Sequence, residues 1–318
     1  MRFFTKVVLS AVLLAFGLVP GWGCQFPEPS QAEPDFPIWQ APTPPAKGKT
    51  RLLPKPGRGH NIFKGEAEQW LVEYLTPDEV ELGDPVISTY LNQVVNHLTT
   101  FCPEPTRHFQ VVVLDEDLPD AFCQGDGKIY ITVGFLKMME SEDELAGVLA
   151  HEMGHEALKH IPKTLSRQLL WMIGTTKITS REQLNSALTR LSEKYQKIPV
   201  AAFMERLSGI SRMDELKADQ CAVATLFRAG YNPRALITIL ARAERYQKEA
   251  YGKGYGKAKF VQFWLGTHPP TSFRKLAFQL ERMFIKLPPK DTRYPSQAFE
   301  AMKALLEKAD EEGEEKEN

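Results

Sequence analysis

The pentapeptide H-E-M-G-H at positions 151–155 constrains this chain more than any other feature, because its spacing suits a helix that binds a metal ion. Residues four apart on a helix lie about 40° apart around its axis, so the imidazoles of His151 and His155 point the same way. Two such imidazoles can hold one Zn²⁺ ion, with Glu152 beside a metal-bound water. The alternative is a solvent-facing helix that carries these three residues for no chemical purpose.

A catalytic zinc site commonly takes three protein ligands and leaves one position for water. His160 is the nearest candidate for the third ligand. On a continuous helix it is rotated by about 140° from His155, so the sequence predicts that it faces away from the metal. The spacing also lacks the glycine turn found in metzincins. We therefore expect His160 to be a packing residue or a support behind a ligand.

Glu215 is the better third ligand, because it lies beside the apolar stripe of a predicted amphipathic helix. Glu215 and Asp219 are four residues apart and share a face of that helix. One carboxylate can bind zinc while the other accepts the second ring N–H of a ligand histidine. Alone, an E-x-x-x-D pair is typical of an exposed charged face, and its weight here comes from the motif upstream.

Residues 61–308 predict one mostly helical domain of the α+β class. The helix that contains the motif begins at Ser141, because this hydroxyl can cap the first turn and Glu144 completes a capping box. Glycines at the turn 125–127 indicate a hairpin. The predicted helices before the motif span 63–75 and 85–101, and the predicted strands span 109–114, 121–124 and 128–133.

The start of the chain differs from the rest in its pattern. Arg2 and Lys6 precede an apolar run at 7–19, which has about the length of the hydrophobic region of a signal peptide. This run is short for a helix that spans a bilayer. We therefore expect residues 1–23 to be a signal peptide and the protein to be exported, either periplasmic or anchored on the extracytoplasmic side of a membrane.

Cys24 follows this region and is a candidate for the lipid-modified first residue of a lipoprotein. Lipidation would hold the protein on a membrane surface, whereas plain cleavage would release it, and an uncleaved anchor is a third alternative. Residues 24–60 are rich in proline, lack apolar periodicity and predict a linker.

The other three cysteines bear on how the domain is held together. In an oxidising compartment, Cys102 and Cys123 are candidates for a disulfide that joins the end of a helix to the edge strand. Two separate thiols are the alternative. Cys221 is expected to be a buried thiol.

The charge of the chain is nearly balanced, with 39 basic and 40 acidic side chains and a formal net charge of −1. Such a weak field does not gather nucleic acid, so we expect no nucleic-acid partner. Acidic residues concentrate in a tail at 309–318, which we expect to be solvated and disordered.

Four motifs in a fixed order carry a resemblance to a known family. After H-E-M-G-H come E-L-K-A-D at 215–219, A-G-Y-N-P at 229–233, and T-H-P-P-T at 267–271 followed by Arg274. Across about residues 61–280, this order resembles the zinc peptidase family that contains the CAAX prenyl proteases and the HtpX-type and Oma-type quality-control proteases. Within that family, the chain is similar to the exported bacterial members rather than to the polytopic ones.

The resemblance implies a zincin-like metallopeptidase domain with a small antiparallel sheet, whose edge strand lies beside the active-site helix. It implies one Zn²⁺ ion per chain, held by His151, His155 and Glu215. It also implies that Glu152 is the catalytic residue and that Asp219 supports the site.

Two further residues are candidates for catalytic roles. His268 lies on a turn made rigid by Pro269 and Pro270. It is a candidate to donate to the oxyanion or to bind zinc as a fourth ligand, and the alternative is a histidine that caps the next helix. Arg274 is a candidate partner for a carboxylate near the site, with an exposed arginine as the alternative.

These residues favour a zinc-dependent endopeptidase that cleaves unfolded or misassembled proteins in the cell envelope. Zinc lowers the pKa of its bound water to about 7, and Glu152 is placed to take the proton as hydroxide attacks a peptide carbonyl. The substrate would add itself as a strand to the edge of the sheet. The alternative is a chaperone-like envelope protein that keeps zinc structurally and binds clients without cutting them. Glu152 favours the enzyme, because a structural zinc site needs no base.

Overall fold

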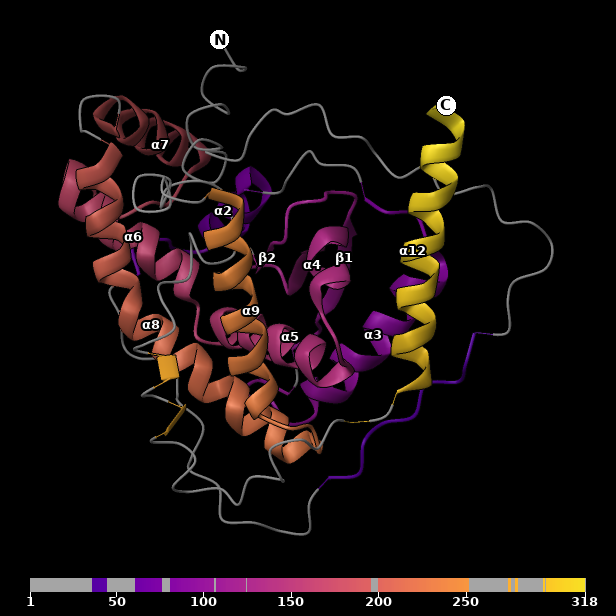
Figure 1. The fold of residues 1–318 in the computed structure, drawn as a ribbon. Coiled ribbons are helices and arrows are strands. Elements are labelled where there is room, and N and C mark those ends of the chain that lie inside the picture. Colours follow the sequence, from indigo (N-terminus) through magenta and orange to yellow (C-terminus); the bar gives the residue numbers. More distant parts are fainter. Residues whose placement is uncertain are drawn as a thin grey trace.

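The computed structural model describes residues 36–44, 61–75, 81–105, 107–123, 125–195, 200–251, 274–275, 278–279, 294 and 296–317. These ranges form a mostly helical α+β domain, in which helices surround a small sheet (Figure 1). Each helix within them is too short or too polar to cross a membrane.

The sheet has three strands, which are β1 (Gln110–Leu114), β2 (Ala121–Cys123) and β3 (Lys128–Thr132), in the spatial order β1-β3-β2. The predicted hairpin is confirmed, since β2 pairs antiparallel with β3. The expectation of a wholly antiparallel sheet is corrected, because β1 runs parallel to β3. The chain reverses direction twice between these two strands, and β2 occupies the far side of β3. Among the described residues, β2 is therefore an edge strand.

Helix α5 (Glu142–Ala157) is the centre of the fold, and all of its residues are buried. It begins where the capping pattern predicts, because the Ser141 hydroxyl accepts a hydrogen bond from the backbone N–H of Glu144. Helices α8 (Val200–Ala229) and α9 (Arg234–Tyr251) both pack against it, and β2 lies along it as well.

Two glycines of α5 allow its neighbours to approach closely. A Cβ atom on Gly154 would lie 3.0 Å from the carbonyl oxygen of Ala218 in α8. A Cβ atom on Gly147 would lie 3.2 Å from the Cα atom of Leu236 in α9. Contacts this short leave no room for a larger residue, so the sequence G-V-L-A-H-E-M-G within α5 fixes where both helices cross it.

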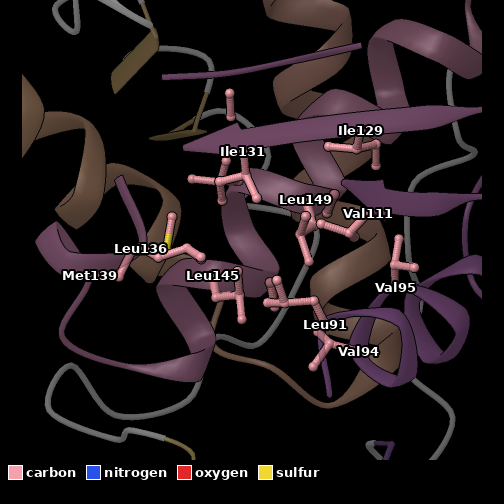
Figure 2. Close-up of a cluster of buried hydrophobic side chains, with 14 of the residues drawn as sticks. Leu91, Val94, Val95, Val111, Ile129, Ile131, Leu136, Met139, Leu145 and Leu149 are labelled. Atoms are coloured by element: carbon pink, nitrogen blue, oxygen red, sulfur yellow. The ribbon is translucent and has the colours of Figure 1, made fainter. Parts of the chain in front are cut away.

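The larger hydrophobic core lies between the sheet, α5 and helix α3 (Pro85–Thr99) (Figure 2). Asp84 caps α3 by accepting hydrogen bonds from the backbone N–H groups of Val86 and Ile87. Side chains from all three parts meet in this core, among them Leu91, Val94, Val95, Val111, Ile129, Ile131, Leu145 and Leu149.

A second, smaller core lies on the side of α6 and α7 in Figure 1. It is built by α2 (Ala67–Leu75), α6 (His160–Ile173) and α7 (Arg181–Tyr195), together with residues just before α2 and α7. Its buried members include Leu71, Leu169, Ile178, Leu184, Leu188 and Leu191.

The first and last described segments, 36–44 and helix α12 (Gln297–Glu317), both pack against the rest of the domain. Helix α12 packs against α4 (Val133–Met138) on the side opposite α6 and α7 in Figure 1. It continues to Glu317, so the expected disordered tail is helical, consistent with the high helix propensity of its Ala, Lys and Glu residues. Within the segment 36–44, Phe36 and Trp39 pack against the larger core.

For Cys102 and Cys123, the structure shows the alternative to the candidate disulfide, which is two separate thiols. Cys102, Cys123 and Cys221 are all buried free thiols. Burial raises the pKa of the Cys123 thiol well above its ordinary value, and nearby Glu156 and Glu152 raise it further. A thiol in this setting stays protonated, and its place in the structure is that of a small apolar side chain.

Candidate metal centre

The three predicted ligands meet at one point between α5 and α8. The Nε2 atoms of His151 and His155 lie 3.0 Å apart. The two carboxylate oxygens of Glu215 lie 3.5 Å from the Nε2 atom of His151 and 3.3 Å from that of His155. Within the described part of the chain, these three buried side chains form a group whose ligand atoms all lie within 4.8 Å of one another.

The helix crossing explains why residues so far apart in sequence meet here. Gly154 lies in the turn of α5 between the two histidines, and it allows the α8 backbone at Ala218 to come close. Glu215 lies on α8 one turn before Ala218, so its carboxylate faces the two imidazoles.

The Asp219 carboxylate contacts His151 at Nδ1, on the side of the ring opposite the candidate ligand atom Nε2. The Asp219 Oδ1 atom lies 2.9 Å from His151 Nδ1, as expected for a carboxylate that supports a ligand histidine. Arg274 donates to both oxygens of Asp219: its Nε atom lies 2.7 Å from Oδ2, and its Nη2 atom lies 2.5 Å from Oδ1. An Arg274 nitrogen also lies 3.1 Å from His151 Nδ1, but a guanidinium only donates, so the acceptor for a proton on Nδ1 is Asp219.

Charges around this group are strongly coupled. Burial raises the pKa of Asp219, but the Arg274 guanidinium and the His151 ring outweigh it and leave that pKa below its ordinary value. Burial and Arg274 lower the pKa of His151, whereas Asp219 and Glu215 raise it to about 9 in the metal-free protein. Without a metal, the surroundings of His151 therefore favour the protonated, positively charged form of its ring.

The structure corrects the position predicted for His160. Helix α5 ends at Ala157, and Lys159 adopts a left-handed conformation with φ of 55° before α6 begins at His160. This break turns the His160 ring back onto His155, with ring centroids 4.8 Å apart and the two Nδ1 atoms 3.1 Å apart. The prediction that His160 faces away was wrong because it assumed a continuous helix. The expectation of a packing or supporting residue agrees with this position.

Glu152 lies on α5 between the two histidines and is almost fully buried, with 1% of its surface exposed. Its charge, with those of Asp219 and Glu215, raises the pKa of Arg274 against the opposing effect of burial. The carboxylate therefore belongs to the same charged cluster as the candidate ligands. His268 lies outside the described residues.

Comparison with known proteins agrees with this geometry. The model of peptidase family M48 matches residues 86–279, which include both histidines, Glu215 and Arg274. The chain belongs to peptidase family M48. It therefore contains a metallopeptidase domain, and the sequence resemblance is confirmed.

Curated relatives of this M48 chain match about half of it. The mitochondrial metalloendopeptidase OMA1 of Arabidopsis thaliana is 26% identical over 161 residues, which are 51% of this chain and 29% of the relative. The OMA1 protein of Saccharomyces cerevisiae is 27% identical over 160 residues, or 49% and 41%. The beta-barrel assembly-enhancing protease of Escherichia coli K12 is 23% identical over 168 residues, or 51% and 33%. The chain thus spans well under half the length of these relatives.

The residues at the centre of the M48 domain fit a zinc ion. Two imidazoles and one carboxylate are a donor set that catalytic zinc sites use. Their ligand atoms converge, and the Nδ1 atom of each ring has a polar neighbour behind it, which is Asp219 for His151 and His160 for His155.

Sequence reasoning missed two residues that link the M48 site to the sheet. Glu156, which directly follows the second histidine, is 3% exposed and accepts a hydrogen bond of 3.2 Å from the backbone N–H of Gly127. Arg107 pairs with the same carboxylate and donates 2.9 Å to the carbonyl of Gly125. Both contacts hold the turn between β2 and β3 against α5. The sequence signal that could have identified Glu156 is an acidic residue directly after the second histidine, on a helix predicted to be buried.

Proposed function

We propose that this chain is a zinc-dependent endopeptidase that cleaves unfolded or misassembled proteins in the cell envelope. The observation that carries the proposal is the convergence of His151, His155 and Glu215 beside Glu152, on a helix that runs along an edge strand. Membership of family M48 supports proteolysis as the activity.

In this proposal, His151, His155 and Glu215 hold one Zn²⁺ ion per chain. A bound zinc ion would polarise the scissile carbonyl and lower the pKa of a water molecule to about 7. Glu152 is the residue that would accept a proton from the attacking water and return it to the leaving amine. Asp219 keeps the proton of His151 on Nδ1, and Arg274 keeps Asp219 charged and fixed in place.

The edge strand β2 supports a broad substrate range. Among the described residues, β2 pairs with β3 on one side and with no strand on the other, which is the side where we propose that an extended peptide adds. A peptide added there would be recognised mainly through backbone hydrogen bonds, which carry little sequence information. Unfolded segments are the chains that can adopt this extended form, so unfolded or misassembled polypeptides are the proposed substrates.

The proposed location rests on the sequence. A signal peptide at 1–23 would export the chain to the periplasm, or to the outer face of a membrane if Cys24 is lipidated. The name of the Escherichia coli relative refers to assembly of β-barrels, which supports an envelope role for this chain.

His268 is proposed to lie near the metal, as an oxyanion donor or a fourth ligand. Loss of an oxyanion donor in His268→Ala would lower turnover by roughly 10²- to 10³-fold. Loss of a fourth ligand would leave cleavage at least as fast as wild type. A variant that is less stable but normally active while folded would assign His268 to the alternative, a helix cap.

Cleavage of casein with and without a chelator tests the proposal, together with the variants Glu152→Gln and His151→Ala. We expect chelation to abolish cleavage and Glu152→Gln to lose roughly 10²-fold or more in rate while it keeps its zinc. His151→Ala should lose most of its zinc in elemental analysis. If the wild-type protein binds unfolded chains without cutting any, the protease proposal is overturned in favour of a chaperone-like protein. If His151→Ala keeps a full equivalent of zinc, the proposed metal site is wrong.

A further inference from the structure

We propose that His160 is a positioning residue for the candidate metal ligand His155, because its Nδ1 atom accepts the proton that His155 carries on Nδ1. The inference rests on the metal site of the proposed function. It concerns how one ligand is held, and it does not depend on which proteins are cut.

The first step concerns the proton on His155. Its Nε2 atom faces the site, 3.0 Å from His151 Nε2 and 3.3 Å from a Glu215 oxygen. A neutral imidazole that binds metal through Nε2 carries its proton on Nδ1. The ring is largely buried, so this N–H requires an acceptor inside the protein. His160 Nδ1 lies 3.1 Å from it.

The second step concerns the tautomer of His160. If its Nδ1 atom accepts, its own proton must be on Nε2. That atom lies 3.7 Å from Asp214 Oδ1, beyond a direct hydrogen bond but close enough for the carboxylate to attract the proton. Asp214 is itself held by Arg167, whose Nη2 atom lies 2.7 Å from Oδ2. Lys217 also pairs with Asp214 Oδ1, at 3.8 Å, so the charge of Asp214 is shared with two cations. Its Oδ1 atom is nevertheless an acceptor beside Nε2, and it favours the tautomer that the acceptor role requires.

The backbone explains how His160 reaches this position. The left-handed residue Lys159 lies between the end of α5 at Ala157 and the start of α6 at His160, and it turns the first side chain of α6 back toward His155. His160 is 4% exposed, and its ring packs edge-on against that of His155. The two ligand histidines are thus supported differently. His151 meets a carboxylate directly, whereas His155 meets a neutral imidazole that a carboxylate orients.

The test compares three variants of His160 in the full-length chain. In His160→Asn, the side-chain oxygen can take the place of Nδ1, because both atoms are bonded to Cγ. In His160→Gln, the polar atoms lie one bond further out, near the place of Nε2. His160→Leu fills a similar volume and has no acceptor. The zinc affinity of the metal-free protein is measured by competition with a chelating dye, and the absorption spectrum of the Co²⁺-loaded protein reports ligand geometry.

We expect His160→Leu and His160→Gln to bind zinc roughly 10- to 100-fold more weakly, which is the usual effect of losing an outer partner of a ligand. His160→Asn should stay closer to wild type in both affinity and Co²⁺ spectrum. Wild-type affinity in the leucine variant, or equal losses in the asparagine and glutamine variants, would overturn the proposal. If the leucine variant does not fold, the asparagine and glutamine pair still decides it.

This experiment separates the two proposals. Zinc affinity is measured without a substrate, so a chain that binds zinc but cuts nothing leaves the role of His160 open to the same test. Retention of full zinc by His151→Ala would instead remove the metal site on which the role of His160 depends. Wild-type zinc affinity in His160→Leu, with normal proteolysis, would remove the positioning role and leave the protease intact.

Discussion

At its first turn, helix α5 carries three buried carboxylates, Glu142, Asp143 and Glu144, whereas at its last turn it carries His155 and Glu156. The partners at the first turn come from segments spread along the whole chain. The partners at the last turn come from the sheet, α6 and α8, and they surround the candidate metal centre. One helix thus joins a polar cluster that links distant segments of the chain to a second cluster at the candidate metal centre.

The first turn is a junction of distant segments. Glu142 accepts hydrogen bonds from the hydroxyl groups of Tyr90 at 2.9 Å and Tyr231 at 2.8 Å, and from the indole N–H of Trp39 at 2.9 Å. Asp143 accepts from two backbone N–H groups, those of Asn232 at 2.8 Å and Tyr294 at 2.6 Å. Arg242 of α9 pairs with Glu144 at 2.5 Å. Three carboxylates at a helix N-terminus also interact favourably with the helix dipole.

We expect the contacts of the first turn to determine mainly the stability of the protein, and those of the last turn to determine mainly metal or substrate binding. Loss of a partner at the first turn should lower stability and leave the metal affinity of the folded protein unchanged. Loss of a partner at the last turn should alter metal or substrate binding with a smaller effect on stability.

The largest expected effect is at Glu142. In Glu142→Ala, the buried hydroxyl groups of Tyr90 and Tyr231 lose their acceptor, which costs about 1–3 kcal/mol each in free energy of unfolding. Urea unfolding measures this loss, and Glu142→Gln is the control that keeps one oxygen as an acceptor. A zinc affinity that falls in step with stability in the folded variant would contradict the separation of the two turns.

A smaller effect is expected at Glu156. Glu156→Leu removes the acceptor of the Gly127 N–H, so the turn between β2 and β3 should loosen and KM for an unfolded substrate should rise about tenfold, or about 1.4 kcal/mol, with kcat nearly unchanged. Glu156→Gln keeps an acceptor oxygen and should stay near wild type. Hydrogen exchange at the Gly127 amide provides a second measurement. Loss of stability equal to that of the Glu142 variant would show that both turns serve folding alike.

The smallest effect is expected at Trp39. In Trp39→Phe, the aromatic ring stays and the hydrogen bond to Glu142 is lost, so the free energy of unfolding should fall by about 1 kcal/mol. Thermal unfolding measures it, with Ile38→Ala as a matched control, because the Ile38 side chain is 91% exposed. Equal changes in both variants would mean that the segment 36–44 adds no specific contact to the junction.

The parts of the fold that follow local rules could be predicted from the sequence. The start of α5 follows from a hydroxyl cap, and the hairpin follows from glycines at its turn. The three candidate ligands follow from helical spacing and from the family resemblance. Asp219 and Arg274 were named for the same reasons, and the structure brings them to His151.

Other parts depend on contacts that no local pattern encodes. The break at Lys159 has a left-handed residue that is neither glycine nor asparagine, so no sequence signal marked it, and His160 was assigned the wrong direction. The contacts of the segment 36–44 rest on the aromatic residues Phe36 and Trp39 in a proline-rich stretch without periodicity. The pairing of β1 with β3 is non-local, and propensity does not specify its direction.

The closeness of α5 and α8 at Gly154 also determines when a metal can be bound. His151 and His155 lie on one short helix, whereas Glu215 follows about sixty residues later and reaches them after α8 has crossed α5. A newly made chain therefore has at most a two-ligand site, and tight zinc binding requires that the tertiary structure has formed. If the candidate site is the active one, a chain would gain its proposed proteolytic activity only after it has folded.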